Sequence, residues 1–240
     1  MQTTKAIVLR TLKYSDTRIV VSLFTESHGL VSALVRVSHL GRSGARSALW
    51  QLLNIVEVNV DYRPSVDFQK LGEVQISSPW RDLPYHPFKA SVAMFLADFL
   101  YHCLRGEGEN RPLFSFLENS LSWFDETNDA IANFHLFLMI RMTRFLGIWP
   151  GIDGYAEGKV YDLKNSCFSS LMPAHGQYVE PCEASLIPSL LRMDYSTMHL
   201  LKLTRNERRH MLEILLRYYQ IHVPGFGELQ SMDVLRELFS

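Results

Sequence analysis

The chain has 240 residues, of which 47% are hydrophobic and 20% charged, and this balance excludes an intrinsically disordered protein. It contains no run of about 18 consecutive apolar residues, which excludes a transmembrane helix on hydropathy. The N-terminal residues carry charges inside their only apolar run, so we expect no secretory signal peptide.

The net charge is −1, a value that does not by itself indicate a nucleic-acid-binding protein. The charge is unevenly distributed, because residues 1–50 contain seven lysines and arginines but only two acidic residues. The first fifty residues therefore carry +5 and the remainder carries −6. This asymmetry favours a local positive surface in the N-terminal part of the protein.

The first eighty residues have the pattern of short strands. The clearest alternation lies in residues 52–62, where Val56, Val58, Val60 and Tyr62 alternate with polar residues, as in a half-buried antiparallel strand. The expected strands cover residues 5–10, 18–25, 30–37, 52–62 and 68–77. Five short antiparallel strands with a long loop after the third are typical of an OB-type barrel, and an SH3-like barrel is the alternative.

Prolines at positions 79, 84 and 87 end the sheet, and the apolar spacing beyond them is helical. Helices are expected at residues 88–105, at 111–125, from Asn128 or Asp129 to 145, again from 183, at 204–222 behind a capping box, and after Ser231. The sequence therefore predicts an α+β protein with an OB-type domain at residues 1–79 and a helical domain at residues 80–240.

An irregular, glycine-rich segment covers about residues 149–181 and contains VYDL and CFSSL, which predict a small hairpin. In and just after it lie Cys167, His175 and Cys182, the best candidate metal set. Structural zinc sites generally use C-x₂₋₄-C pairs, because two thiolates on one tight turn can bind the ion together. The wide spacing here disfavours zinc, so we expect no cofactor and interpret both cysteines as small apolar fillers.

The remaining cysteine, Cys103, also has no close partner in the sequence. An odd number of widely spaced cysteines indicates a reducing compartment, hence the cytoplasm.

The sequence carries none of the common catalytic signatures. It contains no Walker A motif, G-x-G-x-x-G, H-E-x-x-H, G-x-S-x-G or S-x-x-K. Its carboxylates are scattered, and no pair stands out as a general acid and base. We therefore expect a protein that is not an enzyme.

A basic loop follows the third predicted strand. It holds Arg36, His39, Arg42 and Arg46, spaced by glycine and serine and without an acidic residue. Such a loop beside a small barrel can hold a phosphate backbone without reading its sequence. Solvated surface arginines on an ordinary loop have the same composition, so the residues alone leave both interpretations open.

Two further groups of cations lie on predicted helices. Arg141 and Arg144 share a face of an otherwise apolar helix, and they could hold a carboxylate of an acidic, aromatic-ended peptide tail. Arginines in such a position more often pair locally or lie over the core. Lys202, Arg205 and Arg209 recur at helical spacing as a cationic stripe or a solvated face.

Several motifs occur in a characteristic order. Residues 6–11 read AIVLRT, residues 14–16 form a Tyr-x-Asp turn, residues 23–29 read LFTESHG, residues 36–51 form the basic loop ending in LWQ, and residues 216–238 read LRYYQIHVPGFGELQSMDVLREL. This order and spacing resemble the bacterial recombination mediator family RecO over essentially the whole chain. Many members have two C-x-x-C pairs in the segment that corresponds to residues 149–181. This chain has none, so zinc is not carried over, and the insertion resembles a degenerate zinc finger.

The resemblance implies an OB-fold domain that binds single- and double-stranded DNA and anneals complementary strands. It implies action with RecR in loading RecA onto strands coated by single-stranded-DNA-binding protein, whose acidic, Phe-ended tail the helical domain contacts. The DNA contacts implied in this way are Lys5, Arg10, Arg18, Arg36, Arg42 and Arg46. Arg141 and Arg144 become candidates for the tail, and the expected location is the cytoplasm, at the nucleoid.

Two functional hypotheses therefore stand side by side. The first is a DNA-binding repair module without enzymatic turnover, supported by the positive N-terminal part, the barrel pattern and the family resemblance. The second is a protein-interaction adaptor that binds acidic peptide tails and has only incidental DNA affinity, which the near-neutral total charge favours.

Overall fold

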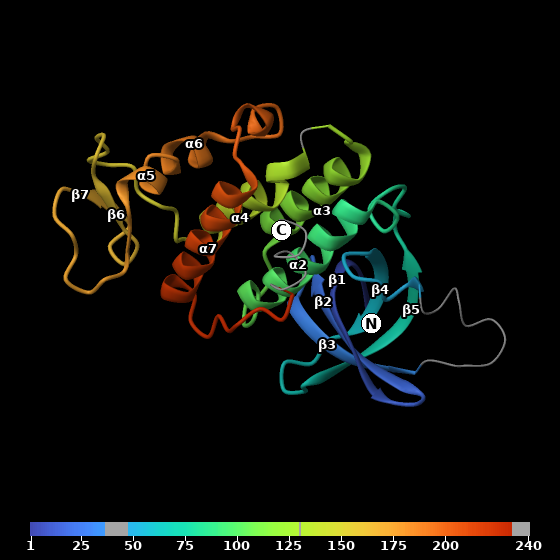
Figure 1. Ribbon diagram of the computed structural model, residues 1–240. Helices are drawn as coiled ribbons and strands as arrows, with labels where there is room; N and C mark the ends of the chain where they lie inside the picture. The colour runs from blue at the N-terminus through green and yellow to red at the C-terminus, as the bar shows by residue number, and fades with distance from the viewer. Residues whose placement is uncertain (37–47, 130, 232–240) are drawn as a thin grey trace. The chain divides into compact units, whose positions relative to one another are not determined.

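The computed structural model describes residues 1–36, 48–129 and 131–231, and this part of the chain forms two compact units. One unit contains Met1–Glu126 and the segment that begins at Leu229, and the other contains Thr127–Glu228. The first unit holds a barrel and two helices, and the second holds several helices and a small sheet (Figure 1).

The first unit is built on a closed barrel of five strands. The strands are β1 (Gln2–Ser15), β2 (Arg18–Thr25), β3 (Gly29–Arg36), β4 (Ile55–Asp61) and β5 (Phe68–Ile76). They pair in the order β1-β2-β3-β5-β4, and β4 returns to β1. This arrangement confirms the predicted OB-type barrel. The expectation of purely antiparallel pairing was wrong for β3 and β5, which run parallel because β5 enters between β3 and β4.

Strand β1 is much longer than the predicted strand at residues 5–10. It pairs with β4 through Gln2–Ile7 and with β2 from Ala6 to Ser15, with a register shift between Val8 and Arg10. A bulge of this kind bends a strand, so one strand can close both edges of the barrel. Its polar ends lack an apolar pattern, and only pairing with neighbouring strands makes them extended.

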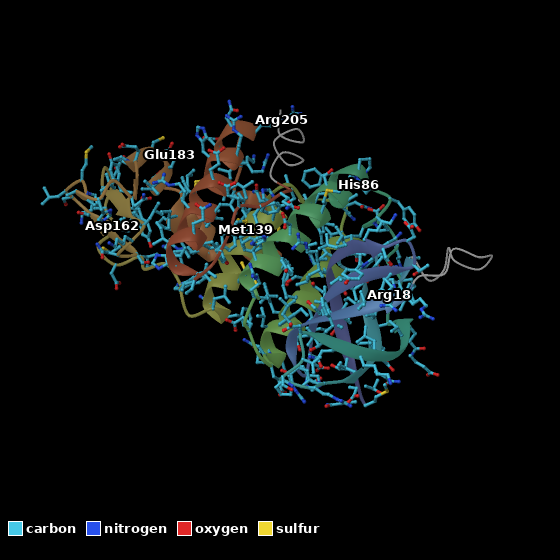
Figure 2. The ribbon with its side chains drawn as sticks, turned by 90° about the horizontal axis from the view of Figure 1, so that it is seen from below. Arg18, His86, Met139, Asp162, Glu183 and Arg205 are labelled. Carbon is cyan, nitrogen blue, oxygen red and sulfur yellow. The ribbon has the colours of Figure 1, made fainter. Side chains whose placement is uncertain are left out.

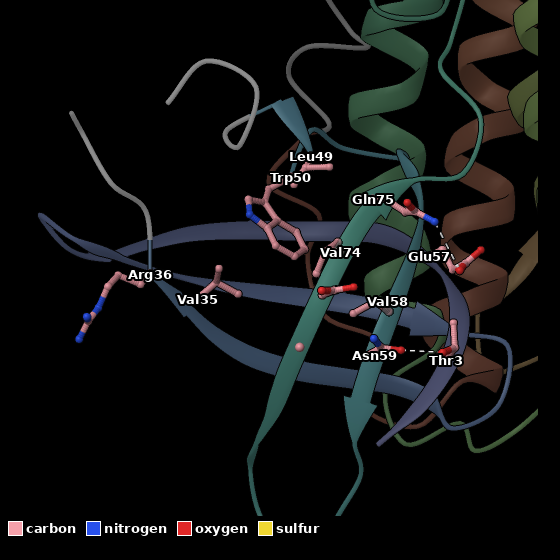
Figure 3. Close-up of a pocket in the computed structure, with 12 residues that line it drawn as sticks. Thr3, Val35, Arg36, Leu49, Trp50, Glu57, Val58, Asn59, Val74 and Gln75 are labelled. Atoms are coloured by element: carbon pink, nitrogen blue, oxygen red, sulfur yellow. Dashed lines mark hydrogen bonds between the residues drawn. The ribbon is translucent and has the colours of Figure 1, made fainter. Parts of the chain in front are cut away.

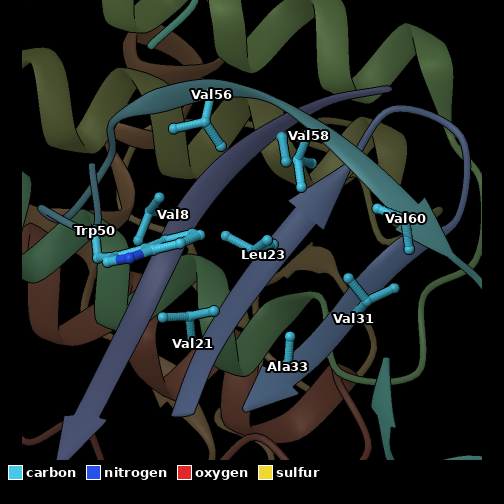
Figure 4. Packing of buried hydrophobic residues seen from close by; sticks show 10 residues of the cluster. Val8, Val21, Leu23, Val31, Ala33, Trp50, Val56, Val58 and Val60 are labelled. Carbon is cyan, nitrogen blue, oxygen red and sulfur yellow. The ribbon is translucent and has the colours of Figure 1, made fainter. Parts of the chain in front are cut away.

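The barrel core is filled by small and branched apolar side chains together with one tryptophan (Figure 4), and β5 adds the partly buried Leu71 and Val74. The fully buried members of the core are Ala6, Val8, Val21, Leu23, Val31, Ala33, Trp50, Val56, Val58 and Val60. Burial of each larger side chain contributes about 1.5–3 kcal/mol. The alternation predicted for β4 is confirmed for Val56, Val58 and Val60, which all point into the core while the intervening residues are only partly buried. It was wrong for Tyr62, which lies beyond the end of β4 and is 41% exposed.

Two long helices complete the first unit, α2 (Pro87–Cys103) and α3 (Arg111–Glu126). Both lie within two residues of the predicted helices. Proline in the first turn of each helix costs no hydrogen bond. Helix α2 packs against β1, and most of its apolar residues are buried.

A buried ionic cluster joins both helices to the linker after β5. The Asp125 carboxylate accepts hydrogen bonds from the backbone N–H groups of Arg81, Asp82 and Leu83 at 2.6–2.9 Å. Lys89, whose side chain is 0% exposed, donates to the Asp125 carbonyl at 2.8 Å and lies 2.7 Å from the Asp82 carboxylate. A buried ammonium needs such partners, since an unpaired charge in the interior is strongly destabilising.

The turn between β2 and β3 contacts the loop between α2 and α3 at Gly29. Its φ is +68°, and a Cβ there would lie 2.1 Å from the Glu107 carbonyl oxygen and 2.5 Å from that of Gly108. The neighbouring Leu30 N–H donates to the Glu107 carbonyl at 3.3 Å. Only glycine permits both the backbone conformation and this close approach.

In the second unit, α4 (Phe134–Phe145) is preceded by the 3-10 turn η1 (Ile131–Asn133). The predicted start at Asn128 or Asp129 was therefore wrong, although the predicted end is confirmed. The Asn133 amide donates to the carbonyls of Met198 and Leu201 at 3.0 and 2.7 Å. These long-range bonds fix the turn before α4, and no local signal in the sequence specifies them.

The small hairpin predicted near residues 160–170 is confirmed by β6 (Val160–Asp162) and β7 (Cys167–Ser169), and β8 (Tyr178–Val179) adds a third strand. Short helices α5 (Pro181–Ala184) and α6 (Ile187–Arg192) and the turn η2 (Met198–Leu200) follow.

Helix α7 (Arg205–His222) begins with the predicted capping box, in which Thr204 and Glu207 exchange hydrogen bonds. Lys202 lies before this helix, so the predicted helical stripe through Lys202 was wrong. The helix predicted after Ser231 lies outside the described residues. Among the helices formed by the described residues, none combines the length and apolar character needed to cross a membrane.

Replacing Gly29 by alanine tests the contact between the β2–β3 turn and the α2–α3 loop. Gly29→Ala should lower the free energy of unfolding by about 4 kcal/mol, because the clash adds to a left-handed backbone cost of about 1–2 kcal/mol. Gly106→Ala is the matched control, since its φ is +84° but no heavy atom lies within 4 Å of the added carbon. Urea unfolding measures both, and equal losses would contradict the proposed clash.

The Asp125 cluster predicts a second stability effect. Asp125→Ala leaves three backbone N–H groups without their acceptor and should cost about 3 kcal/mol or more. Glu126→Ala changes the next carboxylate, which is exposed, and should change stability by about 0.5 kcal/mol at most. A small effect of Asp125→Ala in thermal or urea unfolding would show that the cluster is not needed for stability.

Candidate nucleic-acid interface

Two of the predicted DNA-binding arginines meet at one end of the barrel. Arg18 begins β2 and Arg36 ends β3, and their Cα atoms are register partners in the β2–β3 ladder. Both are exposed, and Arg18 is labelled in Figure 2. Their neighbours Ile19 and Val35 pack against the core, so the period of two turns the arginines to the outer face. Two like charges held side by side favour an anionic partner.

The chain between β3 and β4 returns to the same barrel. Arg42 and Arg46 lie in residues 37–47, outside the described residues, so their positions are not part of the geometry. Just before β4, Leu53 N–H donates to the Val8 carbonyl at 2.7 Å, and Val8 N–H donates to the Asn54 carbonyl at 2.9 Å. These bonds fix the end of the basic loop to β1, while its beginning is Arg36 on β3.

A groove of about 730 Å³ opens in the barrel wall between β3 and β5 (Figure 3). These strands pair only at Ser32–Phe68 and Ala33–Gln69, so the wall is open beyond that point, with the indole of Trp50 inside the opening. Trp50, which sequence reasoning treated only as the end of the basic loop, is 7% exposed and belongs to the core.

Charges on the rim of this groove differ from side to side. Arg36 lies at the end of β3 and points away from Trp50 (Figure 3), whereas Glu57 and Glu73 line the side formed by β4 and β5. Carboxylates repel a phosphate backbone. We therefore expect a phosphate chain to follow the outer face of β2 and β3 rather than this groove.

The remaining predicted barrel cations, Lys5 and Arg10, contact the helices of the first unit. Lys5 Nζ lies 2.7 Å from Glu118 on α3, and this hydrogen bond raises the pKa of Lys5. The Arg10 guanidinium lies 4.8 Å from the centre of the Tyr101 ring on α2. Arg10 pairs with Ser22 rather than with the Arg18 end of β2. The structure thus brings Arg18 and Arg36 together but gives Lys5 and Arg10 other contacts.

Arg141 and Arg144 on α4 have different surroundings. The Arg141 guanidinium donates to the Met193 carbonyl and lies 5.8 Å from the Phe137 ring, and burial, with a smaller effect of Arg144, lowers its pKa. Arg144 is exposed, with its guanidinium 4.0 Å from the centre of the Trp149 ring. Of the two arginines, Arg144 is therefore the one that can bind an anionic, aromatic ligand, together with Trp149.

The three residues of the candidate metal set do not form a cluster. Among the residues that the structure describes, no group of three or more His, Cys, Asp or Glu side chains is placed to hold a metal ion. Cys167 is half-buried on β7 and Cys182 is exposed on α5. His175 instead lies 3.3 Å from the carboxylate of Asp162 (labelled in Figure 2).

Asp162 organises the turn between β6 and β7. Its carboxylate accepts hydrogen bonds from the Lys164 and Asn165 N–H groups at 2.9 Å and from the Asn165 side chain at 2.7 Å. Burial opposes the charged form, but these bonds and His175 outweigh it and lower the pKa of Asp162. Hydrogen bonds to a carboxylate thus hold this turn.

Two family models match this sequence and together cover most of it. Residues 1–80 match the model described as "Recombination protein O N terminal", and residues 85–231 match "Recombination protein O C terminal". The first match coincides with the barrel, and the second begins just before α2.

Full-length relatives give the same result. A DNA repair protein RecO from Phocaeicola vulgatus is 46% identical over 240 residues, covering 100% of both chains. The protein of that name from Bacteroides fragilis is 43% identical and covers 100% of this chain and 99% of its own. That from Flavobacterium psychrophilum is 33% identical and covers 99% of this chain and 98% of its own.

Proposed function

This chain belongs to the RecO family, and we propose that it is a non-catalytic DNA-binding recombination mediator in DNA repair. The names of its relatives support a role in repair, and the absence of the common catalytic motifs from the sequence supports a role without turnover. In this proposal it binds single- and double-stranded DNA and promotes annealing of complementary strands. With RecR, it would help RecA to load on strands coated by single-stranded-DNA-binding protein.

The observation that carries the proposal is the Arg18–Arg36 pair on the outer face of an OB-type barrel. The pair stands where the basic loop leaves β3, so Arg42 and Arg46 follow it directly in the chain. Cations in this arrangement neutralise phosphates and release counterions, which favours binding without sequence preference. Neutralised phosphates also repel each other less, and two complementary strands can then approach.

Lys5 and Arg10 have a secondary place in this proposal. Each already contacts an acidic or aromatic side chain of the first unit, so each would add to the positive potential rather than bind a phosphate directly. We propose no metal or cofactor, and we place the protein in the cytoplasm at the nucleoid, where its DNA substrate lies.

Charge reversal tests the DNA site. The double variant Arg18→Glu/Arg36→Glu should weaken binding of a fluorescein-labelled oligodeoxythymidine by about tenfold or more at low salt, and reduce the dependence of affinity on salt. Lys164→Glu/Arg192→Glu is the matched control, since both residues are exposed in the second unit. Fluorescence anisotropy at several salt concentrations measures binding, and Arg42→Glu/Arg46→Glu extends the test to the loop.

Three outcomes of this experiment are informative. Loss in the barrel variant with little change in the control supports the site. An equal loss of DNA affinity in both variants would show that the effect comes from the change in net charge and not from a site on the barrel. If the wild-type protein fails to bind DNA at low salt, the mediator proposal fails and the adaptor alternative is favoured.

The adaptor function has its own supporting observation, the exposed Arg144 guanidinium over Trp149. A carboxylate can bind the guanidinium while an aromatic end group packs beside the indole. We propose this as the contact for the acidic, Phe-ended tail of single-stranded-DNA-binding protein, with Arg141 in a supporting position. Both functions can belong to one protein, because they use different units.

Substitution of Arg144 tests this contact. Arg144→Glu should weaken binding of a synthetic acidic peptide that ends in phenylalanine by about five- to tenfold, because an attractive charge becomes repulsive. Arg192→Glu on α6 is the matched control. Isothermal titration calorimetry measures both, and unchanged peptide affinity in Arg144→Glu with intact folding rules out this site.

A further inference from the structure

A second pocket of the first unit lies at the β4–β5 loop, away from the Arg18–Arg36 pair. Its volume is about 320 Å³, at the lower end of the range of about 300–1,000 Å³ for small-ligand pockets. Its wall combines β3, the β4–β5 loop and the end of α2. The residues that carry the argument are Tyr62, Asp67, Tyr101 and Arg105.

Tyr62 is held in a defined orientation on this wall. The His28 imidazole stacks on one face of its ring, with centroids 4.4 Å apart and planes within 5°. The Tyr62 side chain is nevertheless 41% exposed and lines the pocket. A large exposed aromatic ring that is already stacked on one face is a ready platform for another flat ring.

Hydrogen bonds of the buried Gln69 side chain stabilise the loop that carries Tyr62. Gln69, which is 7% exposed, accepts from the Arg63 N–H at 2.7 Å and donates to the Arg63 and Val66 carbonyls at 3.0 and 2.7 Å. These bonds use both N–H donors of the Gln69 side-chain amide and one lone pair of its oxygen. The loop therefore presents Tyr62 at little further cost in conformational entropy.

The lining of the pocket carries one positive and one negative side chain. Exposed Arg105 lines the pocket at the end of α2, and exposed Asp67 lines it from the β4–β5 loop. Tyr101 lies between Arg10 and the pocket, with the Arg10 guanidinium 4.8 Å from its ring. A ligand that suits this pocket is flat and aromatic, has N–H donors for a carboxylate, and carries a nearby anionic group for Arg105.

We propose that this pocket receives an unstacked base of single-stranded DNA. Tyr62 stacks on the base, Asp67 accepts from its N–H groups, and Arg105 contacts the adjoining phosphate. The inference rests on the proposed DNA-binding function and adds to it a preference for single strands. Bases of a duplex are paired and stacked, and they cannot enter such a pocket without leaving the helix.

This base pocket also complements the charge site. Arg18 and Arg36 bind the backbone of any strand, whether single or double, because they contact only phosphate. A stacking site distinguishes the two, since only a single strand offers a free base face. Tyr62 is thus the residue that would give the barrel its preference for single strands.

The test compares Tyr62→Ala with Tyr62→Phe, on labelled oligodeoxythymidine and on a labelled hairpin duplex. Loss of one stacked base should weaken single-strand binding by about 5- to 150-fold, leave duplex binding unchanged and leave the salt dependence unchanged. Tyr62→Phe keeps the ring and should bind as the wild type does. Tyr85→Ala removes another exposed tyrosine of the same unit, 77% exposed, and is the matched control.

A second measurement follows the base directly. An oligonucleotide containing 2-aminopurine should lose fluorescence on binding the wild type, because stacking on an aromatic ring quenches it, but not on binding Tyr62→Ala. His28 is a positioning residue, so His28→Ala should weaken this quenching and His28→Phe should restore it. Arg105→Ala should lower single-strand affinity and reduce its salt slope by about 0.7.

The outcomes separate this inference from the proposed function. Wild-type binding to both DNA forms, with no change in Tyr62→Ala, overturns the base pocket and leaves the DNA-binding proposal in place. Failure of the wild type to bind DNA overturns both. If Tyr62→Ala weakens binding of single strand and duplex equally, the base pocket is also overturned. The same holds if Tyr62→Ala weakens only the binding of the acidic, Phe-ended peptide.

Discussion

The architecture of the first unit depends on the hydrogen bonds of Asp125 and of the buried Lys89. The Asp125 side chain accepts three backbone N–H bonds from the linker after β5, while Lys89 of α2 binds the Asp125 carbonyl. One cluster therefore ties the linker, α2 and α3 together. Because the linker continues directly from the barrel, the two helices and the barrel become one compact unit.

The position of α2 in turn decides what the barrel can present. Its C-terminal end supplies Tyr101 and Arg105 to the base pocket, and the following loop approaches Gly29 so closely that a Cβ has no room. On β1, Lys5 and Arg10 are engaged by Glu118 and Tyr101. The helices thus engage two cations of the barrel, while Arg18 and Arg36 stay exposed on the β2–β3 face, which is the proposed site for a phosphate backbone.

In the proposed function the two units bind different partners. The barrel unit combines the exposed Arg18 and Arg36 with a tyrosine ring stacked on His28, and charge together with aromatic stacking is the usual basis of single-strand binding. The second unit offers Arg144 over Trp149 beside a buried, apolar α4, a combination suited to an acidic peptide with an aromatic end. The hydrogen bonds that Asp162 accepts hold the turn between β6 and β7 of its small sheet.

Local patterns determined most of the secondary structure. The sequence predicted the alternation in β4, the limits of β2 and the capping box of α7, because each depends on residues a few positions apart in the chain. The start of α4 and the length of β1 were not, since Asn133 bonds residues 65 and 68 positions away and the ends of β1 depend on pairing. The engagement of Lys5 by Glu118, 113 residues distant, and the stacking of His28 on Tyr62 came only from the tertiary structure. The sequence alone determined that cations are concentrated in its first fifty residues. Strand register and helix packing decided which of these cations lie side by side and which contact other side chains of the fold, because the tertiary structure brings together residues that no local pattern connects.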